Sequence, residues 1–193
     1  MENPAVHDSR SKKLVFLSHC CLNQNARMRG LADYPGVVKP LLEYLIAQDV
    51  GIYQMACPEV AYFGTQRWGQ VKEQFDTPMF RTHCQKLVDQ ILDQVEDYIH
   101  GGYTILAFIM MDGSPVCGMN RIPVAKNEGE QLGGMIWYMP QQKHADGQGV
   151  FTETLIESIT RRGLKEIPFV GYPTGEENGL PVDDFAKIKA LFE

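Results

Sequence analysis

The chain has 193 residues, of which 44% are hydrophobic and 22% are charged, and its formal net charge is −6. The length is typical of one domain, and the hydrophobic content is enough for a full core. The acidic balance disfavours nucleic acid as a partner, because nucleic-acid binders usually present a broad basic surface. The first residues lack the apolar core of a signal peptide, and no apolar run approaches the ~20 residues of a membrane span. We therefore expect a cytoplasmic protein without a membrane partner.

Four short apolar runs have the length and composition of buried parallel strands. The predicted strands are residues 13–18, 51–56, 103–110 and 167–171. Stretches with apolar residues at helical spacing separate them. The predicted helices are residues 35–48, 77–100, 151–162 and 184–192. Residues 1–12 are expected to form a flexible tail, so that a single domain spans residues 13–193.

The connections between these elements are less regular. Residues 21–33 and 57–77 are predicted as loops, and within the mixed stretch 119–149 residues 135–139 are predicted as a strand or a lid. Pro40 is expected to disturb the first turns of its helix, and Gly101 to end the long helix before it. The alternation of strands and helices predicts an α/β fold, Rossmann-like, with a mostly parallel sheet flanked by helices. Right-handed crossovers would place the first three strands side by side.

Three of the five cysteines, Cys20, Cys57 and Cys117, each come just after a predicted strand. In open parallel sheets, ligands bind outside the carboxyl ends of the strands, so these thiols should meet in one crevice. With no export signal, cysteines are used for metal binding, catalysis or plain burial rather than for disulfides. The sequence has no close Cys-x-x-Cys pair, and spacing alone leaves metal ligation and ordinary burial both open.

The neighbours of these cysteines are polar. Glu59 follows Cys57 at two residues, and Asp112 and Ser114 precede Cys117 in a turn-forming context. Such residues are unusual beside buried thiols, and they favour a site over a core. Three thiolates would also leave one position of a metal or cluster open for a substrate.

Three motifs carry a resemblance to a known family. They are Ser18-His19-Cys20, Cys57-Pro58-Glu59-Val60 and Asp112-Gly113-Ser114-Pro115-Val116-Cys117-Gly118. Together, in this order over residues 14–120, they resemble the thiouracil desulfidase (TudS) family. The chain departs from the family pattern at Met28 and Arg29, where the family has Tyr-Asp, and at Val116, where it often has a second serine. The resemblance is therefore to a divergent member.

The resemblance implies a [4Fe-4S] cluster held by Cys20, Cys57 and Cys117, with one iron that has no protein ligand. It also implies an acid/base role for Glu59 and a substrate contact for Ser114. The activity implied is hydrolytic, non-redox removal of sulfur from a small thiocarbonyl compound such as a thiolated nucleobase. That chemistry needs a thiophilic Lewis acid for the sulfur and a proton shuttle for the water.

Further substrate contacts are expected from Arg27, Arg67 and Asp112, although solvated surface charge or a structural ion pair is the commoner explanation for such arginines. Cys84 lies on the apolar stripe of the long helix and is expected in the core. Cys21 is expected to face away from the site. His19, Tyr62, Phe63 and Trp68 are each open to a site role or to plain packing.

Several alternatives remain open at this point. Zinc is the lesser alternative to the cluster, since it also accepts thiolates. A non-catalytic metal or iron–sulfur protein, such as a sensor, is the alternative to the enzyme. A third reading is a thiol enzyme with Cys20 or Cys117 as nucleophile, which would need a lowered thiol pKa. A homodimer is left open.

Overall fold

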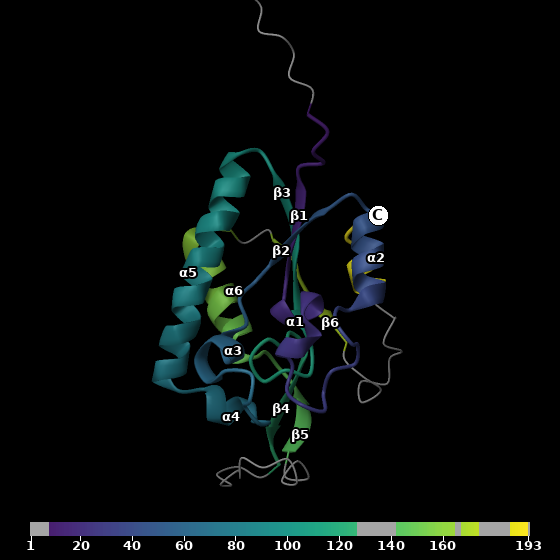
Figure 1. Ribbon diagram of the computed structural model, residues 1–193. Helices are drawn as coiled ribbons and strands as arrows, with labels where there is room; N and C mark the ends of the chain where they lie inside the picture. Colours follow the sequence, from purple (N-terminus) through teal and green to yellow (C-terminus); the bar gives the residue numbers. More distant parts are fainter. Residues whose placement is uncertain (1–7, 127–141, 165–166, 174–185, 193) are drawn as a thin grey trace, which may run out of the picture.

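Four parallel strands form the central sheet in the order β2-β1-β3-β6 (Figure 1). The strands are β1 (Lys13–Leu17), β2 (Gly51–Gln54), β3 (Thr104–Met111) and β6 (Phe169–Tyr172). The computed structural model describes residues 8–126, 142–164, 167–173 and 186–192. The first three strands are neighbours, with β1 between β2 and β3, as right-handed crossovers predict. The predicted α/β fold in a single domain with a parallel sheet is confirmed.

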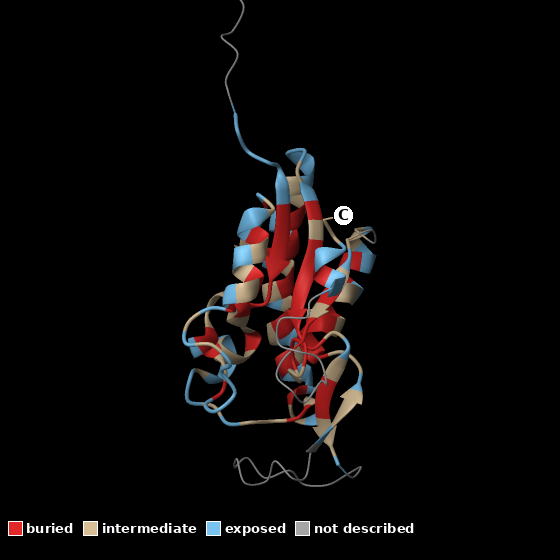
Figure 2. Cartoon of the chain, turned by 90° about the vertical axis from the view of Figure 1, so that its right-hand side faces the viewer, coloured by how far each residue is buried: buried red, intermediate tan, exposed pale blue. Residues whose placement is uncertain are grey.

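The centre of the sheet is also the centre of the core. Phe16 of β1 and Phe108 of β3 are fully buried, and their ring centroids lie 5.2 Å apart. Figure 2 shows the central strands as a buried layer between helices that are exposed on their outer sides. Near-continuous apolar sequence is what a strand needs when both of its faces are covered.

Helices cover both faces of the sheet (Figure 1). On one face lie α2 (Lys39–Ala47) and α7 (Ala186–Lys189), where the Tyr44 hydroxyl donates to the carbonyl oxygen of Lys189 at 3.4 Å. On the other face lie α5 (Pro78–His100) and α6 (Val150–Arg162). Among the described residues, no helix combines the length and the apolar content that a membrane span requires.

The bounds of the long helices follow from local signals. Thr77 caps α5, since its Oγ1 accepts a hydrogen bond from Phe80 N at 3.2 Å, and the helix ends before Gly101 as expected. Helix α2 begins at Lys39 rather than at residue 35. Pro40 explains the difference, because proline is tolerated in the first turn of a helix but not further inside it.

The remaining elements gather at the carboxyl end of the sheet (Figure 1). They are α1 (His19–Leu22), the 3₁₀ helix η1 (Gln24–Ala26), α3 (Pro58–Phe63), α4 (Lys72–Phe75) and the antiparallel hairpin of β4 (Arg121–Ala125) with β5 (Gln142–Asp146). The segments 21–33 and 57–77, predicted as loops, therefore contain short helices. They are too short to show an apolar period, which is why the sequence pattern did not reveal them.

Some predictions lie outside the described residues. The strand or lid at residues 135–139 is one of them, as are residues 1–7 of the expected tail and the first two residues of the predicted final helix. Strand β6 begins at Phe169, two residues after the predicted start, because Pro168 has no N–H to donate.

Candidate functional site

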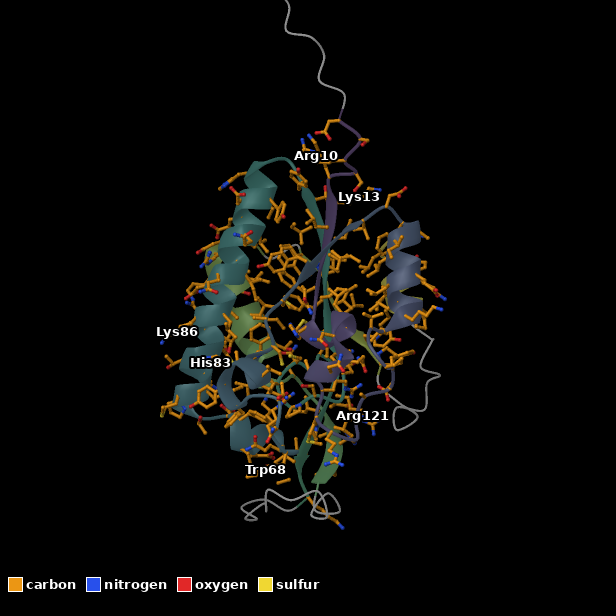
Figure 3. All side chains as sticks on the ribbon, viewed as in Figure 1. Arg10, Lys13, Trp68, His83, Lys86 and Arg121 are labelled. Atoms are coloured by element: carbon orange, nitrogen blue, oxygen red, sulfur yellow. The ribbon has the colours of Figure 1, made fainter. Side chains whose placement is uncertain are left out.

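A cavity of about 160 Å³ opens at the carboxyl end of the sheet, and Cys20, Cys57 and Cys117 all line it. Each thiol comes from a different connection: the first from α1 after β1, the second from the start of α3 after β2, and the third from the turn after β3. Trp68 at the cavity lies at the opposite end of the molecule from Arg10 and Lys13 at the start of β1 (Figure 3). The structure therefore brings together three cysteines that are 37 and 60 residues apart in sequence.

Local hydrogen bonds hold two of the three cysteines, Cys57 and Cys117, in place. Cys57 is the N-cap residue of α3, and its Sγ accepts from Val60 N at 3.5 Å. The Cys117 amide donates to Ser114 Oγ at 3.0 Å. Ser18 precedes α1, and its Oγ is buried without a hydrogen-bond partner in the described part of the chain. The Ser18 hydroxyl, two residues before Cys20, is therefore an unpaired hydrogen-bond donor in the described part of the chain.

Burial strongly disfavours the charged form of these thiols in the protein alone. It raises the pKa of Cys20 to about 12, raises the pKa of Cys57, and raises the pKa of Cys117 well above its usual value. The nearby thiols and Glu59 add to the shift of Cys117. A cysteine nucleophile needs the opposite shift of its pKa.

The donor set at the cavity is soft. Thiolates select soft metal ions and iron–sulfur clusters, and in a cluster each thiolate binds a different iron. Within the described ranges, no three His, Cys, Asp or Glu side chains form a group that could hold a metal ion. The three cysteines around the cavity are nevertheless the type of ligand that an iron–sulfur cluster takes.

Glu59 lines the same cavity from the first turn of α3. Its Oε2 accepts a hydrogen bond from Arg67 Nε at 2.7 Å, and the side chains of Glu59 and Arg67 are 16% and 6% exposed. A nearly buried ion pair between Glu59 and Arg67 thus lies at the wall of the cavity. Arg67 was expected to contact substrate, and it does line the cavity. Its guanidinium nitrogens, however, all donate hydrogen bonds to oxygen atoms of the protein.

Ser114 also lines the cavity, and it serves the turn as well. Its Oγ accepts hydrogen bonds from the amides of Val116 and Cys117, at 3.2 and 3.0 Å. The hydroxyl proton is not used in these two bonds, since the oxygen is the acceptor in both. Ser114 can therefore shape the turn and still donate to a bound molecule.

Asp112, which was expected to contact substrate, is not among the residues that line the cavity. It is buried, and its Oδ1 accepts from the amides of Met119 and Asn120, both at 2.8 Å. A Cβ on Gly171 of β6 would lie 2.1 Å from Asp112 Oδ2, so glycine is needed there for the carboxylate to fit. Asp112 thus supports the turn that carries Cys117.

Arg27 lines the cavity and also forms an ion pair, with Nη1 donating to Asp33 Oδ2 at 2.5 Å. The ion pair agrees with the structural alternative for this arginine, and its contact with substrate stays a prediction. Cys21 and Cys84 lie in the hydrophobic core and not at the cavity. His19 Nδ1 lies 3.3 Å from the carbonyl oxygen of Met55.

The three aromatic residues of the α3–α4 region separate into two groups. Tyr62 and Phe63 pack against Phe80, with ring centroids 5.3 and 6.0 Å away. Trp68 lines the cavity and is 62% exposed. An exposed indole at the rim of a cavity is a natural surface for a flat ring to stack on.

Other wall residues were missed by the sequence analysis. They are the apolar Met28, Leu31, Phe75, Met111 and Pro123, and His144 lines the cavity with them. Pro123 and His144 face each other in the β4–β5 hairpin. The two strands are far apart in sequence, and no short turn motif between them predicts a hairpin.

Comparisons with known proteins bear on the whole chain. No family model matches it. The uncharacterized protein MJ0003 of Methanocaldococcus jannaschii is 32% identical over 160 residues, which cover 78% of this chain and 99% of that protein. The solved structure of the [4Fe-4S]-dependent thiouracil desulfidase TudS superposes with a TM-score of 0.50 at 22% identity, covering 93% of this chain and 99% of TudS. The chain therefore belongs to the family of the Methanocaldococcus jannaschii protein, and it has the fold of TudS.

Proposed function

We propose that the protein is an iron–sulfur-dependent desulfidase that removes sulfur hydrolytically from a small thiocarbonyl compound such as a thiolated nucleobase. The observation that carries the proposal is the convergence of Cys20, Cys57 and Cys117 on one cavity that Glu59 and Ser114 also line. The fold shared with TudS, which is a [4Fe-4S]-dependent thiouracil desulfidase, supports the same conclusion.

The three cysteines would hold a [4Fe-4S] cluster through three of its irons, leaving one iron without a protein ligand. When bound, the cluster supplies a thiophilic Lewis acid for the sulfur of the substrate. The overall reaction replaces C=S by C=O: water contributes the oxygen, sulfide leaves, and no net electron transfer takes place.

The chain's own residues would do the remaining work. Glu59 can take a proton from the attacking water and return it to the leaving group or the ring, since its carboxylate lies at the cavity wall. The Ser114 hydroxyl can donate a hydrogen bond to the ring. Met28, Phe75 and Trp68 provide apolar surface that excludes bulk water and accepts a flat heterocycle.

The first experiment is anaerobic purification with measurement of the absorbance spectrum and of iron and acid-labile sulfide. We expect a brown protein with about four irons and four sulfides per chain, as a [4Fe-4S] centre requires. The loaded protein should then release sulfide from thiolated heterocycles. A protein that stays metal-free after reconstitution, or that holds zinc instead, would contradict the cluster. A loaded protein that hydrolyses no thiocarbonyl compound would point to the non-catalytic alternative.

A further inference from the structure

The guanidinium of Arg67 joins η1 to both ends of α3 beside the cavity. Nε donates to Glu59 Oε2 at 2.7 Å, and Nη2 donates to the carbonyl oxygen of Ala26 at 2.8 Å. Nη1 lies 3.4 Å from the carbonyl oxygen of Gly64 and donates to it. Every nitrogen of the group thus has a protein acceptor, on η1, at the start of α3 and at the end of α3.

These contacts leave the two oxygens of Glu59 in different states. Oε2 is held by Arg67, whereas Oε1 has no hydrogen-bond partner in the part of the chain that the structure describes. Glu59 lines the cavity, and only 16% of its side chain is exposed. One oxygen is therefore fixed by the protein, and the other is free for a ligand or a water molecule in the cavity.

We propose that Arg67 is a positioning residue for Glu59 and not a binding residue for the substrate. It holds one carboxylate oxygen so that the other faces the substrate, and it ties η1 to α3 at the same time. This inference deepens the proposed function and rests on it. It replaces the expectation, drawn from sequence alone, that Arg67 contacts the substrate directly.

Arginine suits this role better than lysine does. Its planar fork presents donors in several fixed directions, whereas an ammonium group is a single point charge on a flexible stem. The three acceptors of Arg67 lie on η1 and at the two ends of α3, so one ammonium cannot reproduce them. Without the Arg67 guanidinium, the Glu59 side chain would sample several rotamers. A displacement of a catalytic carboxylate by about 1 Å can lower the rate about a hundredfold.

The test compares Arg67→Gln, Arg67→Lys and Arg67→Ala with wild type, each as the full chain loaded with iron. We expect Arg67→Gln to lower kcat on a thiolated heterocycle about ten- to a hundredfold, with KM within about twofold and iron content unchanged. Arg67→Lys should recover little of the rate, and added guanidinium ion should restore part of it in Arg67→Ala. Arg81→Gln is the matched control, because Arg81 pairs with Asp76 and Glu153 away from the cavity and should keep its kcat.

A double variant separates positioning from direct binding. If Arg67 acts through Glu59, the pair Glu59→Gln and Arg67→Gln should be no slower than Glu59→Gln alone. A raised KM with unchanged kcat, losses that multiply in the double variant, or a loss of iron would each overturn the positioning role.

A crystal structure of the Arg67→Gln variant tests the role of Arg67 without any measurement of enzyme activity. We expect the Glu59 carboxylate to leave its place at the cavity wall, and an unmoved carboxylate would overturn the inference. If loaded wild-type protein hydrolyses no thiocarbonyl compound, the proposed function fails by itself, and the position of Glu59 in the variant still decides the role of Arg67.

Discussion

At the scale of single residues, the chain offers its own control for the proposed ligands. Cys57 lines the cavity, whereas Cys84 is fully buried in the core on α5. We expect Cys57→Ala to lower bound iron and sulfide to background after anaerobic reconstitution, because two thiolates cannot hold the cluster that three hold. Cys84→Ala should keep its iron, since its thiol does not reach the cavity.

Thermal unfolding and iron content together decide the outcome. Cys57→Ala should unfold in the absence of metal at a temperature close to that of metal-free wild type, because Cys57 is not part of the core. Cys84→Ala should unfold at a lower temperature, since truncation inside a packed helix leaves a cavity. Full iron in Cys57→Ala, or loss of iron in Cys84→Ala alone, would disprove the assignment of ligands.

At the scale of elements, α5 is the longest helix among the described residues, and its start depends on one side chain. Thr77 Oγ1 accepts from Phe80 N at 3.2 Å, which satisfies a backbone donor that the helix leaves unpaired. Thr77→Ala is expected to lower the free energy of unfolding by about 1 kcal/mol. Urea denaturation followed by circular dichroism measures the change.

Thr82, one turn further along α5, provides the comparison for that prediction. It is exposed, and its hydroxyl donates to the carbonyl oxygen of Pro78 at 2.9 Å. Thr82→Ala should change stability by only a few tenths of a kcal/mol, because alanine is the better helix former. Equal losses in the two variants would show that the cap contributes nothing specific.

At the scale of the whole molecule, ion pairs join elements that are distant in sequence. Arg81 of α5 donates to Asp76 at 2.5 Å and to Glu153 of α6 at 2.7 Å. The hydrogen bond from Arg81 lowers the pKa of Asp76. A carboxyl group with a lower pKa in the folded state stabilises the fold above its unfolded pKa, and this contribution disappears as the pH falls through the folded pKa.

The Asp76→Asn variant tests this linkage. Above about pH 5 we expect it to be less stable than wild type, by under about 1 kcal/mol because the pair is partly exposed. The difference should shrink as acid protonates Asp76 in the wild type. Urea denaturation of both proteins between pH 7 and pH 2 would measure this difference in the free energy of unfolding. Asp49→Asn, at an exposed position without an ion pair in the described structure, should show no such pH dependence.

Much of the fold could be read from the sequence because its signals are local. The apolar runs predicted the four strands of the sheet, and Thr77 and Gly101 marked the ends of α5. The short helices α1, α3 and α4 could not be predicted, since one turn carries no apolar period. The β4–β5 hairpin was not predicted for a different reason: no short turn motif lies between its two strands.

The sequence by itself determined the order of strands and helices, and that cysteines follow three of those strands. Parallel connection then requires these residues to meet at the carboxyl edge of the sheet. Only the tertiary structure decided what each polar neighbour touches. Arg67 donates a hydrogen bond to Glu59, and Asp112 accepts hydrogen bonds from the amides of Met119 and Asn120. The physical reason is that a side chain's partner depends on which distant segments pack beside it, whereas helix and strand formation depends mainly on neighbours along the chain.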